Sequence, residues 1–206
     1  MKKYEIEMSS GSIFPKILAF SLPLMLTGIL QLLFNAADIV VMGKFAGDAS
    51  LAAVGSPTTV VNFFVNLFMG LSVGANIVVS MAFGAKDYGK IHRTVQTAVI
   101  ASLILGVAVG ILGFFFARPV LAVLNTPSDI IEKAAVYLKI YFLGLPALMV
   151  FNYIASILCA FGDTQRPLYY LFAGGLINVG LNLIFTVLFK MDVAGVAIAT
   201  VVSETF

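Results

Sequence analysis

One acidic residue, Asp38, lies alone in a long apolar segment that runs from Ile17 to Met42. A carboxylate buried in lipid costs roughly 2.5 to 3.5 kcal/mol on insertion scales, so an intramembrane acid without a nearby cation indicates a functional site. The alternative is an interfacial position. However, four apolar residues follow Asp38 before Gly43, and an aspartate side chain is too short to snorkel far. We therefore expect Asp38 to lie within the membrane and to carry function.

Other oxygen-bearing side chains lie at a depth similar to that of Asp38. At 1.5 Å per residue, Asp38 is about 6 Å from the outer end of its segment, whereas Asn182 and Thr200 are each about 10 Å from theirs. Asn178 lies one turn deeper than Asn182 on the same helical face. Carboxylate, amide and hydroxyl oxygens suit a small hard cation. Either sodium or a proton would neutralise Asp38, as an ion-coupled transporter requires.

The remaining polar residues in the apolar segments receive more modest interpretations. We interpret four amides as groups that join helices, a use worth about 0.6 kcal/mol per hydrogen bond: Gln31, Asn35, Asn62 and Asn66. Glu204 is a second acid, one turn beyond Thr200, and we assign it no role. Pro23 removes a backbone hydrogen bond and provides a bend point, although simple tolerance of proline in a membrane helix explains it equally well.

The composition excludes several classes of protein. The 206 residues are 61% apolar and 11% charged, without Trp, whereas an average soluble domain has about 25% charged residues. This composition excludes intrinsic disorder and a basic surface for nucleic acid. A single Cys159 and a single His92 exclude a disulfide framework and the usual cysteine and histidine metal sites. The chain is therefore predicted to be an integral membrane protein.

The apolar segments predict an all-α fold, a bundle of six transmembrane helices, because about 20 apolar residues cross a bilayer as a helix. The predicted spans are 17–42, 57–84, 94–117, 140–161, 168–189 and 193–206. Ser56 and Pro57 are predicted to begin the second helix. Thr126 to Asp129 form a predicted capping box before an amphipathic stretch that leads into span four. The sixth span covers about 21 Å of the roughly 30 Å hydrocarbon core, so we expect the chain to be part of a longer protein.

The basic residues predict the orientation. Seven Lys and Arg lie on the N-terminal side of the spans and five on the other side. The positive-inside rule therefore favours a cytoplasmic N-terminus, and we expect a multi-pass protein of the plasma (inner) membrane. The first apolar run is longer than a signal-peptide core, so we expect an uncleaved first span.

Five phrases, in order and with consistent spacing, resemble the N-terminal half of multidrug and toxic compound extrusion (MATE) transporters. They are FNAADIVVMGKFAGDASLAAVGSP (34–57), GAKDYGK (84–90), AFGDTQRP (160–167), INVGLNLIF (177–185) and GVAIAT (195–200). The resemblance implies two six-helix lobes that export organic cations and drugs in exchange for sodium or protons. This chain would be the first lobe, with the C-terminal lobe absent from it.

The resemblance also implies roles for individual residues. Asp38 matches the essential carboxylate of the first helix and Pro23 the proline where that helix bends in some members. The cation-site positions match Asn178, Asn182 and Thr200, of which Asn182 falls where some members have Asp. Tyr137 and Asn152 resemble members of a supporting hydrogen-bond network. Beyond the coupling ion, which would be sodium at the four oxygen ligands or a proton, no cofactor is expected.

Three other functions compete with this interpretation. A lipid or lipid-linked sugar flippase has a related architecture, but its cavity tends to hold several basic residues for phosphate, and spans one, two, three and five hold none. An inactive truncated fragment or membrane scaffold is the second alternative, and a continuing reading frame with six more apolar runs would exclude it. An intramembrane enzyme is the weakest, because the spans contain no nucleophile and base constellation.

Overall fold

The computed structural model describes residues 12–45, 47–189 and 191–205, which are almost entirely helical. The elements are α1 (Ile13–Phe45), α2 (Asp48–Gly55), α3 (Thr58–Gly84), α4 (Tyr88–Val123), α5 (Ile131–Ala160), α6 (Gln165–Leu183), the π-helical turn η1 (Ile184–Leu188) and α7 (Asp192–Thr205). In the described part, five segments are long and apolar enough to cross a membrane: Ile13–Phe45, Ala49–Gly84, Tyr88–Val123, Ile131–Ala160 and Gln165–Leu188. The chain is therefore an all-α, multi-pass membrane protein.

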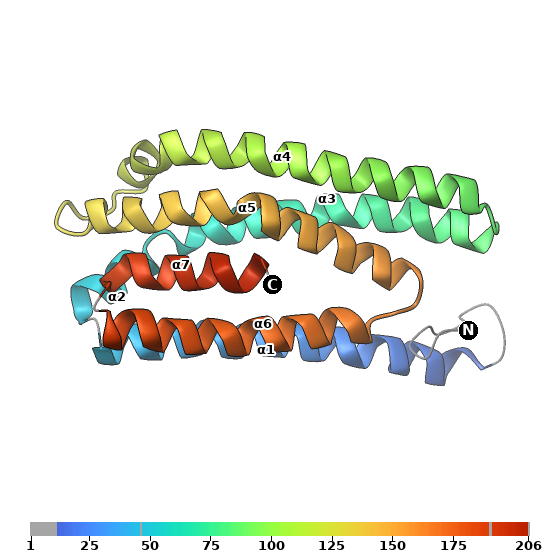
Figure 1. Ribbon diagram of the computed structural model, residues 1–206, viewed down its shortest axis with the longest axis horizontal. Helices are drawn as coiled ribbons and strands as arrows, with labels where there is room; N and C mark the ends of the chain where they lie inside the picture. The colour runs from blue at the N-terminus through green and yellow to red at the C-terminus, as the bar shows by residue number, and fades with distance from the viewer. Residues whose placement is uncertain (1–11, 46, 190, 206) are drawn as a thin grey trace.

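Helix α5 lies at the centre of the bundle. It packs against α4 and α3 on one side and against α7 on the other, while α1 and α6 lie side by side as a separate pair (Figure 1). Leu138, Leu145 and Met149 of α5 are fully buried. In contrast, α1 buries only Pro23, Val41 and Met42 among its described residues. Most of α1 therefore presents its apolar side chains outward from this chain, and its position depends on α6.

Glycines allow the central helices to approach closely. A Cβ atom on Gly106 of α4 would lie 2.6 Å from the Cα of Pro146 in α5, and one on Gly110 would lie 2.7 Å from the carbonyl oxygen of Phe142. These distances are shorter than any real Cβ contact, so only glycine fits at these positions. This explains why small residues line the α4 and α5 contact, as is usual between membrane helices.

The start of the second helix differs from the prediction. Residues 48–55 form the separate helix α2, and Ser56 has right-handed helical angles at the C-terminal cap of α2. The amide of Ser56 donates to the carbonyl of Ala52 at 2.9 Å, and α3 begins at Thr58 without a side-chain cap. The prediction that Ser56 caps this helix is therefore wrong. Residues 48–55, which precede the predicted span 57–84, therefore form an additional short helix.

The predicted capping box before the fourth span is also wrong. Residues 124–130 form turns, and α5 begins at Ile131 with Ile130 as its N-cap and no side-chain cap. The carbonyl of Pro127 instead accepts the amides of Ile130 and Ile131 at 3.2 and 3.0 Å. A backbone carbonyl thus accepts the free amides at the start of α5, which the sequence analysis expected side chains to accept. From there, α5 continues without a break to Ala160, so the amphipathic stretch does lead into span four.

Candidate functional site

Asp38 contacts an asparagine of α6. The Asn182 Nδ2 atom donates a short hydrogen bond to the Asp38 Oδ1 atom. Asn182 is fully buried, whereas Asp38 is half-buried. The carboxylate thus sits at the α1 and α6 contact, and an amide of the neighbouring helix partly solvates it.

Two more side chains extend this contact into a network. The Asn182 amide also donates to Asn178 Oδ1 at 3.1 Å, within α6. Asn178 Nδ2 in turn donates to the Thr200 hydroxyl of α7 at 3.4 Å, and that hydroxyl donates to the Val196 carbonyl at 3.0 Å. Asn182 is the donor from which the hydrogen bonds run outward, in one direction to α1 and in the other through Asn178 to α7. The structure therefore brings together the three residues that the sequence placed at similar depths and Asn178, which it placed one turn deeper.

One oxygen in this network has no donor. The Asn182 Oδ1 atom is buried and accepts no hydrogen bond from the described residues. An unsatisfied buried acceptor costs about 1 to 3 kcal/mol, so such an atom requires an explanation. A small cation between this oxygen and the neighbouring carboxylate would satisfy both. The donor set therefore fits a monovalent hard cation.

A glycine allows α1 to come close enough for this contact. A Cβ atom on Gly175 of α6 would lie 1.9 Å from Cε2 of the Phe34 ring in α1. Phe34 is one helical turn before Asp38, and Gly175 is two turns before Asn182 on the same face. The aromatic ring thus occupies the space that any larger residue would need. The contact between Phe34 and Gly175 positions the carboxylate against the amide.

A tyrosine of α5 completes the surroundings. Tyr137 is 9% exposed, and its ring stacks on Tyr141 with centroids 6.5 Å apart and planes at 13°. It lies close enough to interact electrostatically with both Asp38 and Glu204. Sequence reasoning assigned Glu204 no role, although its spacing of one turn from Thr200 already predicted that the two share a face. The structure places this second acid beside the cluster.

Asn152 and Pro23 lie away from the cluster. Asn152 is fifteen residues beyond Tyr137 on α5, about 22 Å along the axis, and its amide donates to the Leu148 carbonyl of its own helix at 2.9 Å. The structure therefore does not bring Asn152 into the network. Pro23 is also about 22 Å from Asp38 along α1, which continues as a helix through it. The Pro23 carbonyl accepts from the Thr27 hydroxyl at 2.8 Å.

The four amides interpreted as joining helices do not do so in the described part of the chain. Gln31 and Asn35 of α1 and Asn62 and Asn66 of α3 are all exposed. Asn66 donates to the carbonyl of Asn62 in its own helix at 2.8 Å. These amides lie on the sides of α1 and α3 that point out of this bundle, so they join no two helices of the described residues. Exposed amides at membrane depth indicate a polar surface beside this chain rather than lipid.

Comparison with known proteins places these features in a family. The family model described as MatE matches residues 23–184. The probable multidrug resistance protein YpnP of Bacillus subtilis is 29% identical over 204 residues, which are 99% of this chain and 45% of that protein. The multidrug export protein MepA of Staphylococcus haemolyticus is 28% identical over 201 residues, or 94% of this chain and 43% of that protein. The chain thus spans less than half the length of these relatives.

Solved structures agree with this match. The crystal structure of MATE in the bent conformation is 29% identical and superposes with a TM-score of 0.87, over 94% of this chain and 43% of that one. The arrangement of α1 to α7 is therefore the arrangement of helices in part of such a transporter.

Proposed function

We propose, because this chain belongs to the MatE family, that its protein is a secondary antiporter that exports drugs or organic cations. The coupling ion is sodium or a proton, and the chain is the N-terminal lobe, with its N-terminus in the cytoplasm of the cell whose plasma membrane it spans. A second lobe is its partner and completes the central cleft. The multidrug proteins of similar sequence support this function.

The observation that carries the proposal is the contact between Asp38 and Asn182, with the unsatisfied Oδ1 atom beside it. A single carboxylate that one monovalent cation neutralises is the minimal switch for ion coupling. A bound cation competes with the Asn182 amide hydrogens for Asp38. Rotation of the amide presents Oδ1 to the cation and withdraws Nδ2 from both Asp38 and Asn178. The hydrogen bonds to α6 and α7 then rearrange together.

Helix α1 is the element that responds to this change. It buries few side chains, so it moves with less disruption than the central helix α5. Cation binding at Asp38 shifts α1 about Pro23 and reshapes the lobe surface that carries the exposed amides. An amphipathic organic cation is thereby released outward. Rocking of the two lobes opens the cleft between them to one side of the membrane at a time. Neutralisation of the carboxylate and retention of the exported cation are in this way mutually exclusive.

The charge distribution favours this function over a lipid flippase. The half-buried and buried side chains of the cluster are acidic, amide, hydroxyl and phenol groups. An anionic headgroup passing Asp38 and Glu204 would be repelled, whereas an organic cation would be attracted.

Replacement of Asp38 by Asn in the full-length protein tests the proposal. The amide has the same shape and still accepts from Asn182, so folding is retained while the charge is removed. We expect export from loaded vesicles to lose its response to a sodium gradient applied alone and to a pH gradient applied alone. The control is Asp129→Asn, which removes an acid in an exposed turn. Cation-driven export that persists in Asp38→Asn at the level of the control would contradict the proposal.

A further inference from the structure

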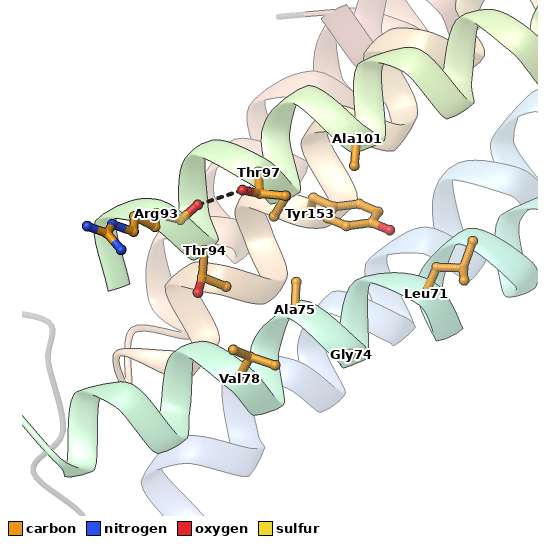
Figure 2. A pocket seen from close by; sticks show the side chains of 10 residues that line it. Leu71, Gly74, Ala75, Val78, Arg93, Thr94, Thr97, Ala101 and Tyr153 are labelled. Carbon is orange, nitrogen blue, oxygen red and sulfur yellow. Dashed lines mark hydrogen bonds between the residues drawn. The ribbon is translucent and has the colours of Figure 1, made fainter. Parts of the chain in front are cut away.

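A groove of about 410 Å³ opens between α3, α4 and α5, away from the carboxylate cluster (Figure 2). It is lined by Tyr153 of α5, which is sixteen residues beyond Tyr137, or about 24 Å along the helix. The α3 wall is apolar, with Leu71 and Val78, whereas the α4 wall carries Thr94 and Thr97 before Ala101. The groove therefore belongs to the other end of the bundle and has no part in the cation network.

An arginine lies at one end of this groove. Arg93 is exposed, near the start of α4, and its guanidinium extends beyond the apolar walls (Figure 2). Its carbonyl accepts from the Thr97 hydroxyl at 2.9 Å, but the guanidinium forms no ion pair within the described ranges. Lys86 lies in the turn before α4 and Lys90 in its first turn, on either side of the N-cap Asp87, so the net charge at this end is positive. This end of the groove is thus positively charged and open to an anion.

A tyrosine whose hydroxyl has no partner among the described residues faces the interior of the groove. Tyr153 is 7% exposed, and its side chain projects between α3 and α4 (Figure 2). Its hydroxyl makes no hydrogen bond to any described residue and is not buried, so it can bond a ligand in the groove. The Tyr153 hydroxyl is therefore a hydrogen-bond donor deep in the groove, away from Arg93 and the two threonines of α4 that also line it.

The length of the groove matches one leaflet. From Arg93 to Ala101, α4 rises about 12 Å, against roughly 15 Å for half of the hydrocarbon core. We propose that this groove binds an anionic phospholipid of the surrounding membrane. Its phosphate pairs with Arg93, an ester carbonyl accepts from the Tyr153 hydroxyl, and one acyl chain lies along Leu71 and Val78. Basic pockets between membrane helices commonly hold anionic headgroups in this way.

The charge of the groove argues against the exported compound as its occupant. An organic cation would have to approach Arg93, Lys86 and Lys90 without a carboxylate among the lining residues. The proposed lipid, by contrast, carries the charge, the acceptor and the apolar chain that the three parts of the groove require. It is also present at high concentration in the bilayer beside the exposed faces of α3 and α4.

Titration of the full-length protein with phosphatidylglycerol, followed by native mass spectrometry, tests the proposal. Guanidinium and phosphate form a charge-assisted hydrogen bond, so we expect Arg93→Gln to weaken binding at least tenfold, whereas Lys90→Gln changes it less than threefold. Tyr153→Phe is expected to weaken it about fivefold. Gly74→Leu should block the groove, because Gly74 lines it and has open space for a side chain. Gly70→Leu is the matched control, because Gly70 lies one turn before Gly74, has equal space and does not line the groove.

The outcomes separate the occupants. Equal losses in Arg93→Gln and Lys90→Gln would reduce the effect to general surface charge and overturn the proposal. Undiminished binding in Gly74→Leu, or equal affinity for uncharged diacylglycerol, would overturn it as well. Competition by an organic cation that strengthens in Arg93→Gln would assign the groove to the exported compound instead. Elution volume and helicity show which variants fold. If Arg93→Gln does not fold, the Tyr153→Phe and Gly74→Leu variants still test the proposal. All these measurements report binding, so failure of export does not affect them.

Discussion

Replacing Gly175 by Ala should separate the carboxylate from its amide partner. The new Cβ atom would lie 1.9, 2.1 and 2.3 Å from three atoms of the Phe34 ring. Ordinary contact begins at 3.4 Å, so the ring or its helix must move by at least 1.5 Å. Because the Cβ falls against one whole side of the ring, a small rotation of the ring does not relieve the overlap. We expect α1 to move away from α6.

The consequence for the site follows from hydrogen-bond geometry. An ordinary bond of about 2.9 Å that lengthens by 1.5 Å exceeds the limit of about 3.5 Å and is lost. The same movement takes Asp38 away from Asn182 Oδ1, the oxygen proposed to share the cation with it. A polar contact with a charged group contributes about 1.5 to 3 kcal/mol, so loss of this shared ligand should raise the concentration of driving cation that gives half-maximal export about tenfold or more. Overpacking should also lower the free energy of unfolding by about 1 to 3 kcal/mol.

The assay is export from loaded vesicles as a function of sodium concentration or pH, together with the thermal stability of the purified full-length protein. Gly180→Ala is the matched control, since a Cβ there has no neighbour within 4 Å. Phe34→Ala in the Gly175→Ala background should restore the cation response by removing the overlap. An unchanged cation response in Gly175→Ala, with Asp38 still required for export, would refute the claim that this glycine positions the carboxylate.

Three further predictions follow from other contacts. Gly106→Ala should lower the free energy of unfolding by about 1 to 3 kcal/mol, because the new Cβ atom would overlap the backbone of α5. Gly70→Ala should not lower it, because a Cβ atom there meets open space. Thermal unfolding of the two variants compares them. Asn152→Leu should leave the cation dependence of export unchanged, because its amide bonds only its own helix; a loss comparable to that of a cluster variant would contradict this. Burial alone would raise the pKa of Asp192. Hydrogen bonds from Lys133 and Ser50, together with the charge of Lys133, outweigh that effect, so the pKa of Asp192 is below its ordinary value. The resulting stabilisation is present above the ordinary pKa and is lost as the pH falls through the lowered pKa. Since both side chains are partly exposed, Lys133→Met should lower the free energy of unfolding by at most about 1 kcal/mol. Unfolding at pH 7 and at pH 3 measures this difference.

The spacing of polar residues predicted much of the candidate site. Helical rise alone placed Asp38, Asn182 and Thr200 at similar depths, and the structure brings these residues together with Asn178. This worked because a membrane helix is nearly straight, so residue number converts directly into depth. Asn152, in contrast, was assigned to the network from the family resemblance alone, and the helical rise already separates it from Tyr137 by about 22 Å along α5.

Helix starts were predicted less well, because alternative hydrogen-bond donors and acceptors compete there. Ser56 has the right residue type for an N-cap but lies at the end of α2, where its amide continues the helix. The Pro127 carbonyl replaces the predicted side-chain cap of α5. Both outcomes depend on local backbone geometry that residue type does not specify.

The sequence by itself determined that this chain crosses a membrane and at which heights along its helices the polar residues lie, since hydrophobicity and helical rise are properties of the residues along one axis. Only the tertiary structure decided which side chains meet across helices. The close approach of Phe34 to Gly175, the unsatisfied oxygen of Asn182 and the groove beside Arg93 each arise from the packing of separate helices. Lateral contacts of this kind depend on how helices rotate and pack, and that is fixed by the whole bundle rather than by any one segment.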